Sequence, residues 1–122
     1  MQQSKKTLII GATHNPSRYA YIATEMLLDY KHEVVLYGIK KGSVLEIPIL
    51  NDWPSEEEID TITMYVNPLI QEAMYLDILA LKPSRIIFNP GTENKKLADL
   101  ALSQNIATQN ECTLVLLRTN QY

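Results

Sequence analysis

The chain has 122 residues, of which 46% are hydrophobic and 20% charged, a balance typical of one globular domain. Its net charge of -3 argues against a nucleic-acid partner, because proteins that bind nucleic acid usually carry excess positive charge. Cys112 is the single cysteine, which excludes an internal disulfide and favours the cytoplasm. No apolar run approaches the roughly 20 residues of a membrane span. We therefore expect one cytoplasmic domain over residues 1–122, with neither nucleic acid nor membrane as partner.

Short apolar runs alternate with segments of helical periodicity along the whole chain. The apolar runs predict five strands, at residues 7–10, 33–37, 59–66, 85–88 and 106–108. The periodic segments predict helices at residues 19–30, 67–81 and 92–104, and the tail at 112–117 fits a helix or a strand, with helix favoured. Because strands and helices alternate and the strands lack polar alternation, we expect a three-layer α/β/α fold with a five-stranded parallel sheet.

The same periodicity predicts which helical side chains face the core. These are Ala20, Ala23, Leu27 and Tyr30 in the first helix, Leu69, Ala73, Leu76 and Ala80 in the second, and Leu97, Leu100 and Ala101 in the third. Residues 46–50 predict a short extended piece. The acidic residues at 55–58 predict the start of a helical turn, because acidic side chains suit a helix N-terminus.

The loops that follow the strands form the candidate site, because ligands of open parallel sheets bind beyond the carboxyl ends of the strands. The first of these loops, residues 11–18, begins with Gly11, which permits a tight turn and close approach of a ligand. Backbone amides at the start of the next helix favour a phosphate there. Thr13, Ser17 and Arg18 add hydroxyl and guanidinium donors, so this loop predicts a phosphate site.

A helix-capping turn also explains this loop. Thr13 stands where the second glycine of a G-x-G-x-x-G dinucleotide fingerprint would be, so the motif is incomplete. Asn15 or Ser17 would then serve as the N-cap, with Pro16 in the first helical turn.

The second loop, residues 38–42, carries two lysines where an NAD-binding unit would hold a carboxylate for the ribose diol. Gly38 is followed by Ile39, Lys40 and Lys41. Positive charge here argues against NAD and fits a phosphorylated ribose, as in CoA or NADP. A solvated lysine pair in a surface turn is the alternative.

Three Asn-Pro pairs follow strands at the same expected edge of the sheet, and they begin at Asn15, Asn67 and Asn89. Proline suits the first turn of a helix, and each asparagine can cap that helix or offer its amide to a ligand. Gly91, just after the third pair, leaves room for a bound group.

The sequence contains no clear catalytic constellation. Cys112 is a candidate thiol nucleophile, but no histidine is placed to activate it, and a buried inert cysteine explains it better. His14 lies in the phosphate-type loop and fits a contact to an anion or a solvent-facing position. Tyr19 and Tyr21 open the first helix and suit either stacking on an adenine or ordinary packing.

Residues 6–21 resemble the opening signature of the CoA-binding domain family, small Rossmann-like proteins similar to the CoA-binding part of succinyl-CoA synthetase. The resemblance continues through residues 33–37, Asn67, the Asn89-x-Gly91 turn and Cys112, and therefore spans nearly the whole chain. It implies a Rossmann-like parallel sheet with CoA lying across its carboxyl edge.

The resemblance also implies roles for individual residues. The CoA phosphates would meet Gly11, Ala12, Thr13, Asn15 and Arg18, with Tyr19 beside them. Gly38 and Lys40 would lie near the adenosine half, and Tyr65, Pro68, Asn89 and Gly91 would line the rest of the groove.

The leading hypothesis is a non-catalytic module that binds CoA or an acyl-CoA as its small-molecule nucleotide ligand. One alternative is a minimal NADP-dependent reductase, which would need a second region to shield hydride transfer. Another is a regulatory or interaction subunit whose nucleotide groove is vestigial. A homodimer is compatible with each of these hypotheses.

Overall fold

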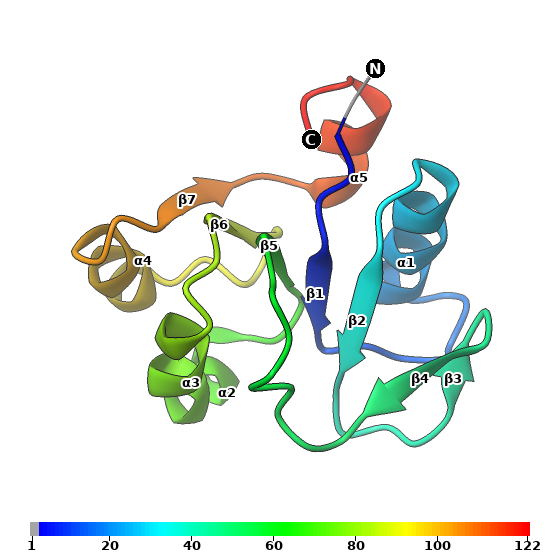
Figure 1. Ribbon diagram of the computed structural model, residues 1–122, viewed down its shortest axis with the longest axis horizontal. Helices are drawn as coiled ribbons and strands as arrows, with labels where there is room; N and C mark the ends of the chain where they lie inside the picture. The colour runs from blue at the N-terminus through cyan, green and yellow to red at the C-terminus, as the bar shows by residue number, and fades with distance from the viewer. Residues whose placement is uncertain (1–2) are drawn as a thin grey trace.

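The computed structural model describes residues 3–122, so residues 1 and 2 of the expected domain lie outside its described part. Seven strands form one sheet in the order β3-β4-β2-β1-β5-β6-β7 (Figure 1). The strands are β1 Thr7–Ile10, β2 Val34–Tyr37, β3 Ser43–Val44, β4 Ile47–Leu50, β5 Thr61–Met64, β6 Arg85–Phe88 and β7 Ala107–Asn110. The helices are α1 Tyr19–Asp29, α2 Pro68–Gln71, the 3-10 helix η1 Glu72–Met74, α3 Tyr75–Ala80, α4 Lys95–Leu102 and α5 Thr113–Arg118.

The five expected strands are present as β1, β2, β5, β6 and β7, and all of them are parallel. The expected total of five is wrong, because residues 43–50 fold into a hairpin that adds β4 parallel to β2 and β3 antiparallel to β4. The extended piece expected at 46–50 is this β4. The hairpin turn places Leu45 and Glu46 at positive φ, a conformation that usually requires glycine or asparagine, so the sequence carries no hairpin signal here.

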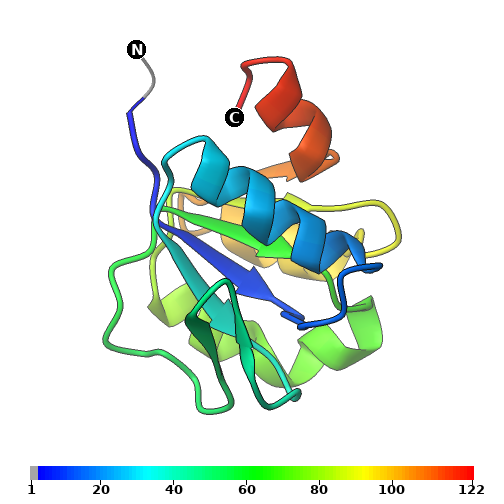
Figure 2. The same cartoon turned by 90° about the vertical axis from the view of Figure 1, so that its right-hand side faces the viewer.

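Helices cover both faces of the sheet, which confirms the three-layer α/β/α arrangement. On one face, Ala20 and Leu27 of α1 and Leu116 of α5 pack in a buried cluster with Ile9 of the central strand. On the other face, α3 and α4 pack in a second buried cluster. The strand residues of this cluster alternate along the strands with those of the first cluster, such as Ile9. Figure 2 shows α1 along one side of the strands and the helices α2 and α3 on the other side.

The helix expected at residues 67–81 is broken into α2, η1 and α3, and its expected inward face is wrong. Leu69, Ala73, Leu76 and Ala80 are all exposed. The buried face instead carries Gln71, Ile78 and Leu79. Both sets recur at helical spacing on opposite sides of the segment, so periodicity alone could not choose between them.

A buried carboxamide explains which side faces inward. Gln71 is fully buried, and its Nε2 donates to the carbonyl oxygens of Val66 at 2.8 Å and Thr92 at 2.9 Å. Its Oε1 accepts from Nδ2 of Asn94 at 2.9 Å, and the same Nδ2 donates to the hydroxyl of Tyr75 at 2.9 Å. Because every polar atom of this glutamine is paired, its burial stabilises the fold and ties α2 to the start of α4.

The remaining helical expectations differ only in detail. Helix α1 agrees with the predicted segment, and the tail is a helix, α5. Helix α4 is shorter than expected and begins after Asn94, which caps it by accepting from the amide of Leu97. Two expected inward residues are exposed instead: Tyr30 lies one residue beyond α1, and Leu100 lies at the margin of the buried stripe of α4. Residues 55–58 form a turn and a bend without a helical residue.

Replacing Gln71 with alanine is expected to lower the free energy of unfolding by about 2–4 kcal/mol, because it leaves buried carbonyl and amide groups without partners. The matched control is Leu69→Ala on the exposed side of the same helix, which should change that free energy by no more than about 0.5 kcal/mol. Urea unfolding followed by circular dichroism measures both. A larger loss for Leu69→Ala than for Gln71→Ala would contradict the orientation of α2.

Candidate functional site

The strand order reverses at β1: the strands that follow it first in the chain lie on its β2 side, and β5 and the later strands lie on its other side. A groove of about 700 Å³ lies at the carboxyl ends of these three strands, the place where open α/β sheets bind ligands. The residues that line it are Ile10, Gly11, Ala12, Thr13, Ser17, Arg18, Tyr19, Ala20, Tyr37, Gly38, Ile39, Lys40, Tyr65, Val66, Ile70, Ala73, Met74, Pro90 and Thr92.

The loops at this edge are in direct backbone contact. The carbonyl of Tyr37 accepts from the amides of Gly11 at 2.9 Å and Ala12 at 3.0 Å. A Cβ on Gly38 would lie 2.8 Å from the carbonyl oxygen of Ala12, and a Cβ on Gly11 would lie 2.9 Å from Cγ1 of Val66. Both positions therefore require glycine for the strand ends to meet this closely.

Asn15 shapes the loop between β1 and α1 without capping the helix. Its Oδ1 accepts from the amide of Ser17 at 3.0 Å and from the hydroxyl of Ser17 at 2.8 Å. The N-cap position belongs to Arg18, which makes no side-chain capping bond. The capping interpretation of this loop is thus wrong, because neither Asn15 nor Ser17 caps α1.

The groove has a cationic end beside this loop. The amides of Thr13 and His14 donate to no residue in the described range 3–122. Arg18 lines the groove, and its guanidinium makes no hydrogen bond or ion pair within the same range. Lys40 lines the groove as well. Free amides beside a free guanidinium form an arrangement that binds phosphate oxygens.

Asn51 holds the lysine-bearing loop in place. Its Nδ2 donates to the carbonyl oxygens of Gly38 at 2.7 Å and Lys40 at 2.9 Å, and the amide of Gly38 donates to the carbonyl of Leu50 at 3.1 Å. These bonds fix the backbone that carries Lys40. Lys41, the next residue, does not line the groove.

The opposite end of the groove is apolar. Val66 follows β5, and Ile70, Ala73 and Met74 come from α2 and η1. Tyr65, the residue before Val66, also lines the groove, and its buried hydroxyl lies near the hydroxyls of Thr63 and Thr113. Burial raises the pKa of the Tyr65 phenol, so the phenolate form is disfavoured at this position.

Comparison with known proteins agrees with this geometry. The model of the family described as CoA binding domain matches residues 5–118, nearly the whole chain. This chain belongs to the CoA-binding domain family. Membership implies a small-molecule ligand, supports CoA binding and gives no support to NADP. None of the curated proteins compared with the chain matches it.

Solved structures share the fold. One described only as an uncharacterized protein is 46% identical, with a TM-score of 0.97, and the match covers 99% of this chain and 100% of that one. A hypothetical protein from Pyrococcus horikoshii OT3 is 20% identical, with a TM-score of 0.86 and coverage of 96% and 84%. A protein from Thermus thermophilus is 16% identical, with a TM-score of 0.86 and coverage of 98% and 91%. At such low identity these last two establish the fold alone.

Among residues 3–122 of this CoA-binding domain, none of the helices has the length and apolar character that a membrane span requires. The cytoplasmic location, the single-domain organisation, the absence of a nucleic-acid partner and the homodimer stay predictions.

Most residues that the sequence assigned to the CoA site do meet at the groove. Those that line it are Gly11, Ala12, Thr13, Arg18, Tyr19, Gly38, Lys40 and Tyr65. Four do not line it: Asn15, Pro68, Asn89 and Gly91. Pro68 occupies the first turn of α2, where Asn67 is the cap and accepts from the amide of Ile70 at 3.0 Å.

Asn89 was expected to line the groove, but it has a structural role instead. It is buried, and its Nδ2 donates to Oγ1 of Thr63 at 2.7 Å and to the carbonyl of Met64 at 2.9 Å. Its Oδ1 accepts from the amide of Thr113 at 2.8 Å. The carboxamide therefore ties β6 to β5 and to the start of α5, which leaves it occupied within the fold.

Several lining residues were not identified from the sequence. Ile39 and Pro90 lie in loops that the sequence did single out, so their place at the strand ends was the available signal. Ile70 and Met74 gave no such signal, because they lie outside the apolar stripe that the helical pattern singled out, and Ala73 belongs to that stripe and was expected in the core. Cys112 is half-buried and, like His14, does not line the groove.

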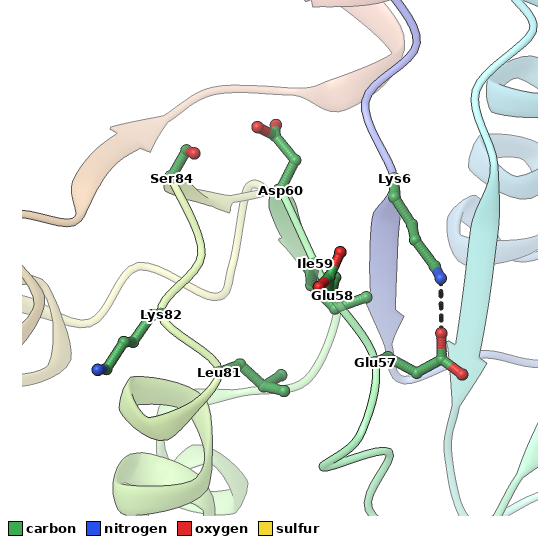
Figure 3. A pocket seen from close by; sticks show the side chains of 8 residues that line it. All are labelled: Lys6, Glu57, Glu58, Ile59, Asp60, Leu81, Lys82 and Ser84. Atoms are coloured by element: carbon green, nitrogen blue, oxygen red, sulfur yellow. Dashed lines mark ion pairs between the residues drawn. The ribbon is translucent and has the colours of Figure 1, made fainter.

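A second cavity of about 430 Å³ lies at the opposite, amino edge of the sheet, and Figure 3 shows its side chains. Nζ of Lys6 lies 2.6 Å from Oε1 of Glu57 and 3.3 Å from Oε2 of Glu33. The hydrogen bond to Glu57 is the main cause of a raised pKa of Lys6. Lys82 points away from this pair (Figure 3). Because Lys6 is already neutralised by carboxylates, this cavity is a poorer phosphate site than the groove.

Alanine at Gly11 is expected to destabilise the protein more than alanine at Gly91. The two glycines have nearly equal positive φ, +97° and +94°, but a Cβ at Gly91 would meet no atom within 4 Å. Gly91→Ala should therefore cost about 1–2 kcal/mol from backbone strain, and Gly11→Ala about 1–3 kcal/mol more from overpacking against Tyr65 and Val66, the two residues after β5. Thermal unfolding measures both. Equal losses would mean that close packing does not constrain Gly11.

Proposed function

We propose that this chain binds CoA or an acyl-CoA in the groove at the carboxyl edge of its sheet and acts as a binding module without catalysing a reaction by itself. The CoA phosphates would lie against the loop 11–18 and the adenosine half near Gly38 and Lys40. The main support is that Arg18 and Thr13 both line the groove, and that within residues 3–122 neither the Arg18 guanidinium nor the Thr13 backbone amide has a hydrogen-bond partner.

The order of groups along the groove supports CoA in particular. CoA carries its phosphates on the nucleotide half and ends in a neutral pantetheine arm. In the groove, Lys40 follows β2, Arg18 follows the central strand β1, and the apolar side chains of Val66, Ile70 and Met74 follow β5 on the other side of β1. The family match adds independent support for the same ligand.

The chemistry of the lining supports a binding role. Its polar side chains are two cations and the hydroxyls of serine, threonine and tyrosine, and none of its described residues is Asp, Glu, His or Cys. Such groups hold and orient phosphates. The Tyr65 phenol, with its raised pKa, is a poor general base near neutral pH.

Replacing Arg18 with alanine is expected to weaken CoA binding by about 1.5–3 kcal/mol, the contribution of a hydrogen bond to a charged group. This corresponds to roughly a 10- to 150-fold rise in Kd, which isothermal titration calorimetry measures. The control is Arg118→Ala, which removes the same charge from α5, outside the groove, and should leave Kd unchanged. Absence of CoA binding to the unmodified protein at millimolar concentration would refute the proposed function.

Lys40 is expected to recognise the 3′-phosphate of CoA. The unmodified protein should bind CoA about two- to fivefold more tightly than dephospho-CoA, the range of a solvent-exposed ion pair, with a smaller difference at high salt. Lys40→Ala should abolish this preference, whereas Lys41→Ala, outside the groove lining, should retain it. Competition titrations with the two ligands give the ratio. If Lys40→Ala keeps the full preference, the assignment of this end of the groove to adenosine is wrong.

A further inference from the structure

We propose that the apolar end of the groove binds the acyl chain of an acyl-CoA, so that the ligand is a thioester with a linear apolar acyl group rather than free CoA. This inference rests on the proposed function and extends it to the class of acyl group.

The first support is the chemistry of that end of the groove. Val66, Ile70, Ala73 and Met74 line it, and the two cations of the groove, Arg18 and Lys40, come from loops after other strands. An apolar chain would gain free energy by leaving water for this surface. An acyl group with a second carboxylate would find no counter-charge among these four side chains.

The second support is an apolar surface that continues from the groove. Leu69 is 76% exposed and Leu76 is 83% exposed, and both lie on the same helical segment as Ile70 and Ala73. Exposed apolar side chains that gather beside a groove mark a binding surface more often than isolated ones do. Ala73 belongs both to the groove lining and to the exposed stripe of Leu69, Ala73, Leu76 and Ala80, so the two surfaces are continuous.

The hydrogen bonds of Gln71 explain why this stripe faces outward. The carboxamide is anchored to Val66 and Thr92 on the inner side of α2, which turns the opposite, apolar side to solvent. Apolar residues on that side contribute little to the core. Their presence beside the groove is therefore better explained by contact with a bound ligand. A chain that leaves the groove past Ala73 would cover part of this stripe.

The test compares CoA with acetyl-, butyryl- and hexanoyl-CoA by isothermal titration calorimetry on the full chain. Each added methylene is expected to lower Kd by about two- to fourfold, where fourfold corresponds to complete burial of the group. Ala73→Gln, a neutral and longer side chain in the path of the acyl group, should reduce the ratio of the Kd of CoA to that of hexanoyl-CoA to near one. Ala80→Gln makes the same change at the far end of the stripe, outside the groove, and should leave that ratio unchanged.

The outcomes separate this inference from the proposed function. CoA binding with equal affinity for all four ligands would overturn the acyl site and leave CoA binding intact, whereas binding of none of them would overturn both. An equal effect of Ala73→Gln and Ala80→Gln on the ratio would also overturn the acyl site. So would sedimentation showing a dimer that both substitutions disrupt, because a second copy of the chain would then cover the stripe.

Discussion

Backbone contact among the loops after β1, β2 and β5 is the constraint on which the candidate site depends. Gly38 lies against the carbonyl of Ala12, and Gly11 lies against Val66, so a side chain at either glycine would push the strand ends apart. Because the loops are this close, residues from three separate segments line one continuous groove. The amides of the first loop and the loop that carries Lys40 consequently face the same space.

The strands and the loop that follows β1 were predictable because their signals are local. A buried strand of a parallel sheet is a continuous apolar run, and a glycine after it marks the turn, so the sequence near Gly11 determines both. The β3–β4 hairpin was not predictable, since Leu45 and Glu46 adopt the turn conformation without the residues that usually announce it. Here neighbouring structure overrides local preference: β4 pairs with β2 and the hairpin closes on itself.

The orientation of α2 and the role of Asn89 depended on long-range hydrogen bonds. An amphipathic pattern ranks side chains by polarity, and by that ranking Gln71 belongs outside and Leu69 inside. The structure reverses the two, because carbonyls of Val66 and Thr92 and the amide of Asn94 converge on Gln71. Asn89 appears equivalent to Asn15 in sequence, yet it is sealed between β5 and α5 while Asn15 is exposed. Such partners lie far apart in the chain, and only the assembled sheet brings them together.

The two hydrogen bonds from Asn51 have a consequence for how fast and how tightly a ligand is held. They order the backbone at Gly38 and Lys40 before anything binds. Ordering a mobile loop costs about 1–2 kcal/mol of conformational entropy per residue, and here that cost is met during folding. Ligand binding at the loop that carries Lys40 therefore needs no slow rearrangement of the main chain. Because little conformational entropy is lost on binding, most of the attraction between the lysine and a phosphate contributes to the binding free energy.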